Sequence, residues 1–160
     1  MSAWASSDGV SLLRDDALDP AAHEGLRQAL ADGVERGLSE APDLPAGSER
    51  YLVRAGGETV GLLALCRDCP RLGLVALIAV AIDPLMRGSS LGARALIAAE
   101  RRLARDGAGE LVTRVPKTNG RGLYFMLRAG YSPVTDIDGE RSPDDGATWF
   151  RRISALTPVE

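Results

Sequence analysis

The sequence has only two cysteines, Cys66 and Cys69, and a single histidine, His23. A structural zinc site takes four cysteine or histidine ligands, so this set is too small to form one. The two cysteines form a CxxC pattern between two strand-like runs, whereas a thioredoxin-like pair lies where a strand turns into a helix. We therefore expect no metal site, and we interpret the cysteines as reduced thiols in a hairpin loop.

Long apolar runs and an excess of basic residues are also missing. The longest apolar run, 72–82, has the length of a strand and contains Gly73, whereas a membrane-spanning helix needs about 20 apolar residues. The net charge of −3 argues against a nucleic-acid-binding protein, because such proteins present a basic surface. The N-terminal segment MSAWASSD lacks the basic part and apolar core of a signal peptide. The sequence predicts a cytoplasmic protein with no nucleic-acid or membrane partner.

What is present fits one soluble domain. The chain has 160 residues, 45% of them hydrophobic and 26% charged, and we find no internal repeat, so we expect residues 1–160 to form a single domain. Hydrophobic spacing and turn residues predict strands at 10–14, 51–55, 59–65, 72–82, 111–115, 134–137 and 148–153. They predict helices at 20–31, at 34–38, from 91 to the Asp106-Gly107 pair, and at 122–129.

The most informative segment is VAIDPLMRGSSLGARAL, residues 80–96. An apolar strand ends at Asp83-Pro84, and a loop of small residues leads into an amphipathic helix. Its apolar residues share one helical face: Leu91, Ala95, Leu96, Ala99 and Leu103. The unpaired N–H groups of a first helical turn, together with the helix dipole, favour an anion. The segment therefore indicates a phosphate-binding loop, although an ordinary loop that precedes a surface helix would have the same outline.

The loop lacks the Gly-Lys-Ser/Thr of a Walker A sequence and the GxGxxG of a dinucleotide site. It resembles the pyrophosphate loop of the GNAT superfamily of N-acetyltransferases, in which Arg or Gln is followed by two residues, Gly, one residue, and Gly or Ala. That pattern falls on Arg87, Ser90 and Gly92. Ser90 stands where the family prefers Gly, and we expect the anion site to survive with some loss of loop freedom.

A second segment, NGRGLYFMLRAGY (residues 119–131), resembles the other GNAT signature. The resemblance implies that Tyr124 is the general acid that protonates the leaving thiolate, and that Asn119 contacts the pantetheine arm or its own strand. Asn119 lies closer to Tyr124 than in the commonest pattern, and Gly122 replaces the usual Ala. The alternative for Tyr124 is a core aromatic beside Phe125.

The order of the expected elements is that of the GNAT fold. The resemblance implies an α/β (α+β) fold: a mixed, mostly antiparallel sheet of about seven strands, flanked by about four helices, with a splay between the fourth and fifth strands, 72–82 and 111–115. Pantetheine would pair with the backbone at the end of the fourth strand, where one N–H would also stabilise the oxyanion. The cofactor-binding residues so implied are Val80, Ala81, Ile82, Arg87, Gly88, Ser89, Ser90, Leu91, Gly92, Ala93 and Asn119. Arg87 would hold the phosphate by its side chain or contribute only its backbone.

No base is evident on the central strands, where the polar side chains are only Thr113 and Arg114. We expect a water relay to deprotonate the amine, or an acid from elsewhere. The candidates for that acid are Glu35, Glu40, Asp136 and Asp138, with His23 as a further candidate base.

The sequence thus predicts an acetyl-CoA-dependent N-acetyltransferase acting on a primary amine of a small molecule or a protein. The acyl donor is acetyl-CoA, and no metal takes part. The alternatives are a non-catalytic CoA-binding sensor or interaction module of the same fold, and an unrelated phosphate-binding regulatory domain. The acidic stretch 136–145 could attract a polyamine or aminosugar, or could be a solvated charge run. A homodimer is left open.

Overall fold

The computed structural model describes residues 2–20, 23–32, 44, 46–108, 110–137, 140–141 and 146–152. Its main sheet contains β1 (Ala5–Ser7), β2 (Val10–Arg14), β3 (Glu49–Ala55), β4 (Glu58–Arg67), β5 (Leu74–Ile82), β6 (Glu110–Pro116), β7 (Ser132–Val134) and β10 (Ala147–Arg152). A separate ladder joins β8 (Asp136–Ile137) to β9 (Glu140–Arg141). The helices are α1 (Glu24–Asp32), α2 (Leu91–Arg105), α3 (Gly120–Arg128) and the short 3-10 helix η2 (Pro84–Met86).

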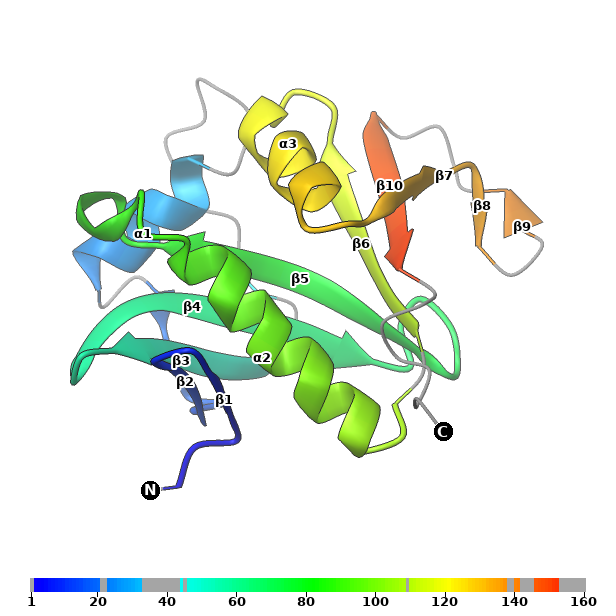
Figure 1. Cartoon of the computed structure of the whole chain (residues 1–160). Coiled ribbons are helices and arrows are strands. Elements are labelled where there is room, and N and C mark those ends of the chain that lie inside the picture. Colours follow the sequence, from blue (N-terminus) through cyan, green and yellow to red (C-terminus); the bar gives the residue numbers. More distant parts are fainter. Residues whose placement is uncertain are drawn as a thin grey trace.

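The eight strands of the main sheet lie in the order β1-β2-β3-β4-β5-β6-β10-β7 (Figure 1). All neighbouring pairs are antiparallel except β5 and β6, which are parallel. The mixed, mostly antiparallel sheet is therefore as expected. Because β5 and β6 run in the same direction, the helices that follow them, α2 and α3, both begin at one edge of the sheet.

The described elements differ from the prediction in a few places. The expected strand at 134–137 is divided at Thr135 between β7 and β8, and β1 was not expected. β1 has only three residues, too few for a periodic signal, and it forms because it pairs with β2. α1 begins at Glu24 rather than at residue 20. The helical piece expected at 34–38 lies outside the described residues, which contain three α-helices and η2.

α2 and α3 cover one face of the sheet, and α1 packs on the other (Figure 1). The predicted apolar stripe of α2 is buried throughout and joins the largest core cluster. On the opposite face Leu26 of α1 packs with Leu62 and Ala81. Each fully buried leucine contributes about 1.5–3 kcal/mol. These two clusters fix the helices on opposite sides of β5.

β5 and β6 pair only over their first residues, Leu74–Leu77 with 110–113, and then separate. The register of β4 with β5 shifts at this point, so that Ile78 is an extra residue in β5. Such a bulge increases the local twist and turns the strand from its neighbour. The hydroxyl of Thr113 donates to the carbonyl oxygen of Leu77 at 2.9 Å and closes the paired region. The expected splay is therefore present, and beyond Leu77 none of the described strands pairs with this edge of β5.

Cys66 and Cys69 are both free thiols. Cys69 lies in the turn between β4 and β5, as expected, whereas Cys66 lies in β4 and pairs with Ala76 of β5, because the strand extends to Arg67. Within the described ranges, no group of three or more His, Cys, Asp and Glu residues is placed to hold a metal ion. None of the described helices has the length and hydropathy needed to cross a membrane.

Candidate active site

The loop between β5 and α2 is built from local constraints. The carboxylate of Asp83 accepts a hydrogen bond from the N–H of Leu85 at 3.0 Å, and this bond starts η2. Gly88 (φ 97°) and Ser90 (φ 59°) have left-handed backbones that turn the chain into α2. Arg94 donates to the carbonyl oxygen of Ser89 at 2.5 Å and so ties the loop to the helix.

Ser90 occupies the N-cap position of α2 but makes no side-chain capping bond. The N–H groups of the first turn are therefore not satisfied by their own cap, which is the arrangement an anion site requires. The left-handed conformation explains why the family prefers Gly at this position, because a Cβ is unfavourable there.

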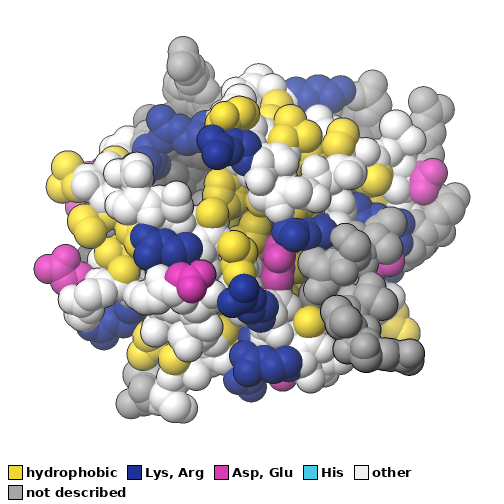
Figure 2. Space-filling model, in the orientation of Figure 1, with side chains coloured by type: hydrophobic (Ala, Val, Ile, Leu, Met, Phe, Trp, Pro, Cys, Tyr) yellow, Lys and Arg dark blue, Asp and Glu magenta, His cyan; other side chains and the backbone are white. Residues whose placement is uncertain are grey.

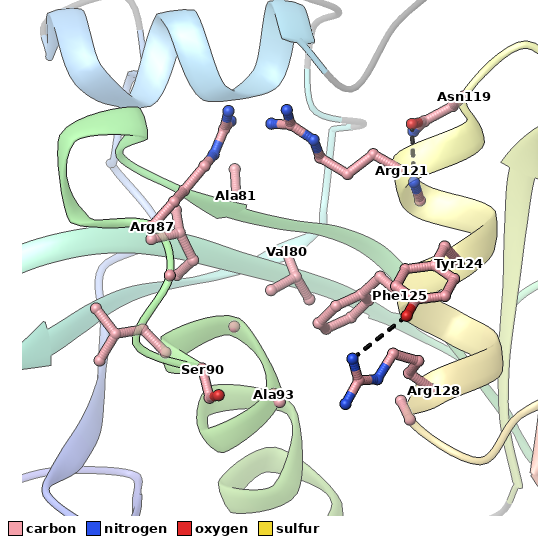
Figure 3. A pocket seen from close by; sticks show the side chains of 16 residues that line it. Val80, Ala81, Arg87, Ser90, Ala93, Asn119, Arg121, Tyr124, Phe125 and Arg128 are labelled. Carbon is pink, nitrogen blue, oxygen red and sulfur yellow. Dashed lines mark hydrogen bonds between the residues drawn. The ribbon is translucent and has the colours of Figure 1, made fainter.

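A cavity of about 490 Å³ opens at the splay, between the start of α2 and one side of α3 (Figure 3). All of the predicted cofactor-binding residues line it except Ser89, whose hydroxyl donates to the carbonyl oxygen of Met86 at 3.5 Å. Val80, Ala81 and Ile82 form its floor on β5, and the loop and first turn of α2 form one wall. The structure therefore brings two distant segments of the sequence, 80–93 and 119–129, to one cavity.

Asn119 lies at the cavity wall and caps α3. Its side-chain oxygen accepts a hydrogen bond from the N–H of Gly122 at 2.9 Å. A Cβ at Gly122 would come within 2.6 Å of the Asn119 amide nitrogen and 3.0 Å of Val115. The glycine that replaces the usual alanine thus makes room for the cap. The expected contact of Asn119 with its own chain is present: the side chain caps α3, and the backbone N–H donates to the carbonyl oxygen of Pro116 in β6 at 2.9 Å.

Tyr124 lies on the side of α3 that faces the cavity, and the residue is 62% exposed (Figure 3). Its hydroxyl accepts a hydrogen bond from Arg128 at 3.3 Å, and the Arg128 guanidinium lies 5.7 Å from the ring centroid. The core alternative for Tyr124 is therefore wrong, since the neighbouring Phe125 and Met126 supply the packing of this helix. The phenol is accessible to a ligand.

Three arginines, Arg87, Arg121 and Arg128, line the cavity, and no described lining residue is acidic or a histidine. The first turns of α2 and α3 carry no acidic residue either. Figure 2 shows Lys and Arg side chains around the apolar centre of this face. The partial positive charge of two helix N-termini adds to this field, so the cavity favours anions.

Arg121 and Arg128 were not among the predicted site residues. They lie three residues before and four residues after Tyr124, and side chains at these spacings share one face of a helix. Helical spacing around Tyr124 was therefore the signal that could have found them.

The two candidate bases that the structure describes, His23 and Asp136, do not line the cavity. His23 and Asp136 are exposed elsewhere, and Glu35, Glu40 and Asp138 lie outside the described residues. Thr113 is buried and bonded to Leu77, and Arg114 is exposed on β6.

Among the described residues, Glu100 of α2 is the one buried acidic side chain, and its hydrogen-bond partners Tyr131 and Arg152 do not line the cavity. It accepts hydrogen bonds from the Tyr131 hydroxyl at 2.7 Å and from Arg152 at 3.3 Å. Arg152 also donates to the carbonyl oxygen of Ala129 at 2.5 Å, at the end of α3. Burial raises the pKa of the Glu100 carboxyl, and its two partners offset this only in part. The cluster ties α2 to the end of α3 and so supports the two walls of the cavity.

Comparison with known proteins agrees with this geometry. The chain matches the family model of the acetyltransferase (GNAT) family over residues 13–131. The protein belongs to the acetyltransferase (GNAT) family. Among proteins with curated annotation, none matches the chain in sequence.

Solved structures share the fold. One is RimL, a ribosomal L7/L12 alpha-N-protein acetyltransferase in complex with coenzyme A, with a TM-score of 0.70, 13% identity, and 98% of this chain and 100% of that chain covered. An acetyltransferase from Thermus thermophilus has a TM-score of 0.63 and 21% identity, with coverages of 91% and 97%. A GNAT family acetyltransferase from Elizabethkingia anophelis with acetyl-CoA bound has a TM-score of 0.59 and 12% identity, with coverages of 91% and 98%. At these identities the likeness shows a common GNAT fold.

Proposed function

We propose that this protein is an N-acetyltransferase that transfers the acetyl group of acetyl-CoA to a primary amine by direct attack in a ternary complex. One observation carries the proposal: the open first turn of α2, the unpaired edge of β5 and the Tyr124 phenol line the same cavity. Family membership supports acetyl-CoA-dependent acyl transfer in general. The coenzyme A and acetyl-CoA complexes of two proteins of the same fold support the choice of donor.

The chain's own groups fit the donor in two parts. The backbone N–H groups of 87–93 hold the diphosphate at the start of α2, where the helix dipole adds to the attraction. The pantetheine arm lies in the splay and pairs with β5 near Val80–Ile82 as an added strand, because β6 leaves that edge free. Asn119 and Gly122 form the end of the cavity nearest the start of α3.

In the reaction the amine nitrogen attacks the thioester carbonyl carbon. The C–N bond forms, the carbonyl oxygen becomes an oxyanion that an N–H of β5 stabilises, and the C–S bond then breaks. Tyr124 gives its proton to the departing thiolate. Arg128 faces the phenol oxygen and stabilises the negative charge that this transfer leaves on it. A water relay removes the proton of the attacking ammonium, since no described lining residue is a base.

The test combines binding and turnover. Calorimetry measures the affinity for CoA, and a thiol reagent measures CoA release when acetyl-CoA is mixed with a panel of primary amines, with mass spectrometry of the products. We expect CoA to bind and at least one amine to gain an acetyl group. Tight CoA binding without acetylation of any amine would favour the non-catalytic module, and absence of CoA binding would refute both functions. The homodimer and the single-domain organisation of residues 1–160 stay predictions.

A further inference from the structure

Arg121 is unusually placed for a residue with only a structural role. It lies in the first turn of α3, where the partial positive charge of the helix end makes a cation unfavourable. Within the described part of the chain its side chain forms no hydrogen bond or ion pair, yet it lines the cavity. A cation kept at such a position points to an anionic ligand.

The side chain of Arg121 extends towards Arg87 from the opposite wall of the cavity (Figure 3). Both guanidinium groups lie towards α1, whereas Ser90 and Ala93 of the proposed diphosphate site lie at the other end of the view. α1 covers the face of the sheet opposite α2, where Ala81 packs with Leu26. The two arginines therefore extend away from the turn that provides for the diphosphate.

The acceptor must reach the thioester from a side that the donor does not fill. With the diphosphate on α2 and pantetheine in the splay, the side that remains is the one towards α1, where the tip of Arg121 lies. An acceptor with several positive charges would be repelled by the three arginines of the cavity. An acceptor with a negative group would be attracted to the same place.

Resting on the proposed function, we infer that Arg121, in the positive field of Arg87, binds a carboxylate of the amine acceptor. The acceptor class is an amino acid or a similar amine that carries a carboxylate, and not a polyamine or aminosugar. A guanidinium matches a carboxylate with two parallel N–H bonds, so this contact would orient the acceptor as well as attract it. Arg121 is then a specificity-determining residue.

The first experiment compares L-amino acids with their primary amides as acceptors, using thiol release and kcat/KM. The two series differ only in whether the carboxylate is present as the acid or as its amide. The amides have the more readily deprotonated amine, so amine reactivity alone would favour the amides. We expect the acids to be acetylated with the higher kcat/KM. A preference for the amides, for polyamines or for aminoalkyl phosphates would overturn the assignment while leaving the acetyltransferase itself established.

The second experiment replaces Arg121 by Gln. Loss of a charge-assisted hydrogen bond predicts a rise in KM for the acid acceptors of about ten- to a hundredfold, with KM for acetyl-CoA and the rate with amides unchanged. The control is Arg105→Gln, the same change at an exposed arginine at the far end of α2, for which we expect native kinetics.

Two results would refute the role of Arg121. A rise in KM for acetyl-CoA alone would mean that it binds the donor, and unchanged KM for every acceptor would mean that it binds neither. If no amine is acetylated although calorimetry shows CoA binding, the proposed function fails and the inference fails with it. Native melting temperatures for R121Q and R105Q would exclude misfolding as the cause of any change.

Discussion

Replacing Tyr124 by Phe removes one oxygen from the cavity and little else. The residue is 62% exposed, and among the described residues only the exposed Arg128 donates a hydrogen bond to its hydroxyl, at 3.3 Å. Exposed polar contacts of this kind change stability by about 0.5 kcal/mol or less. We therefore expect Y124F to fold and melt as the native protein does, so that any loss of rate reports on chemistry.

The size of that loss in rate depends on the Tyr124 phenol, which gives the proton, and on the CoA thiolate, which receives it. General acid catalysis contributes about 10²–10⁴-fold, and a thiolate is a good leaving group because a thiol has a pKa of about 8.5. The phenol is also open to water, which can protonate the thiolate in its absence. We expect the lower end of the range, a fall in kcat of about a hundredfold, or about 2.7 kcal/mol in activation free energy.

The assay is CoA release at saturating acetyl-CoA and acceptor, with KM for acetyl-CoA measured alongside and expected to be unchanged. The matched control is Tyr131→Phe, the same chemical change at a phenol that is only 3% exposed and donates to Glu100 at 2.7 Å. Y131F should lose about 1.5–3 kcal/mol of stability and keep a kcat close to that of the native enzyme. A native kcat for Y124F would refute Tyr124 as the acid, even if the enzyme acetylates amines.

Three further predictions concern the walls of the cavity. A Cβ at Gly92 would lie 3.4 Å from Phe125, an ordinary contact, so we expect G92A to bind CoA as the native protein does. The larger side chain of G92L would fill the cavity and should lower the affinity for CoA about a hundredfold, measured by calorimetry. Equal CoA affinities of G92L and the native protein would contradict the diphosphate site. Ser90 has a left-handed backbone (φ 59°), and Ser90→Gly removes the strain that its Cβ causes there. The greater entropy of glycine in the unfolded chain offsets part of this gain, so we expect the unfolding free energy to rise by about 0.5–1 kcal/mol. A lower melting temperature would contradict the strain at Ser90. Burial raises the pKa of Glu100, so the folded state binds more protons there than the unfolded chain does. Stability therefore falls as pH rises from about 4.5 through the raised pKa. E100Q should lack this part of the pH dependence of the melting temperature, and the same pH dependence in E100Q and the native protein would contradict the prediction.

Much of the fold was predictable because its signals are local. The Asp83-Pro84 pair, the small residues of the loop and the apolar stripe of α2 each depend on neighbours within a few residues, and the structure confirms the elements they predicted. The extra strand β1 was missed because three residues carry no period, and it exists only through pairing with β2. The division of 134–137 between β7 and β8 likewise follows from pairing, since β7 joins β10 and β8 joins β9.

The sequence alone determined that a turn of small residues precedes α2 and that a phenol follows on a later helix, because turn and helix preferences act over short distances. Only the tertiary structure decided that these two parts face one cavity. The bulge at Ile78 separates β5 from β6, the parallel direction of the two strands brings both helix starts to one edge, and packing leaves Tyr124 open while Phe125 joins the core. Arg87 and Arg121 line that cavity from opposite walls. Their relative position depends on contacts between residues far apart in the chain, and local sequence patterns carry no information about such contacts.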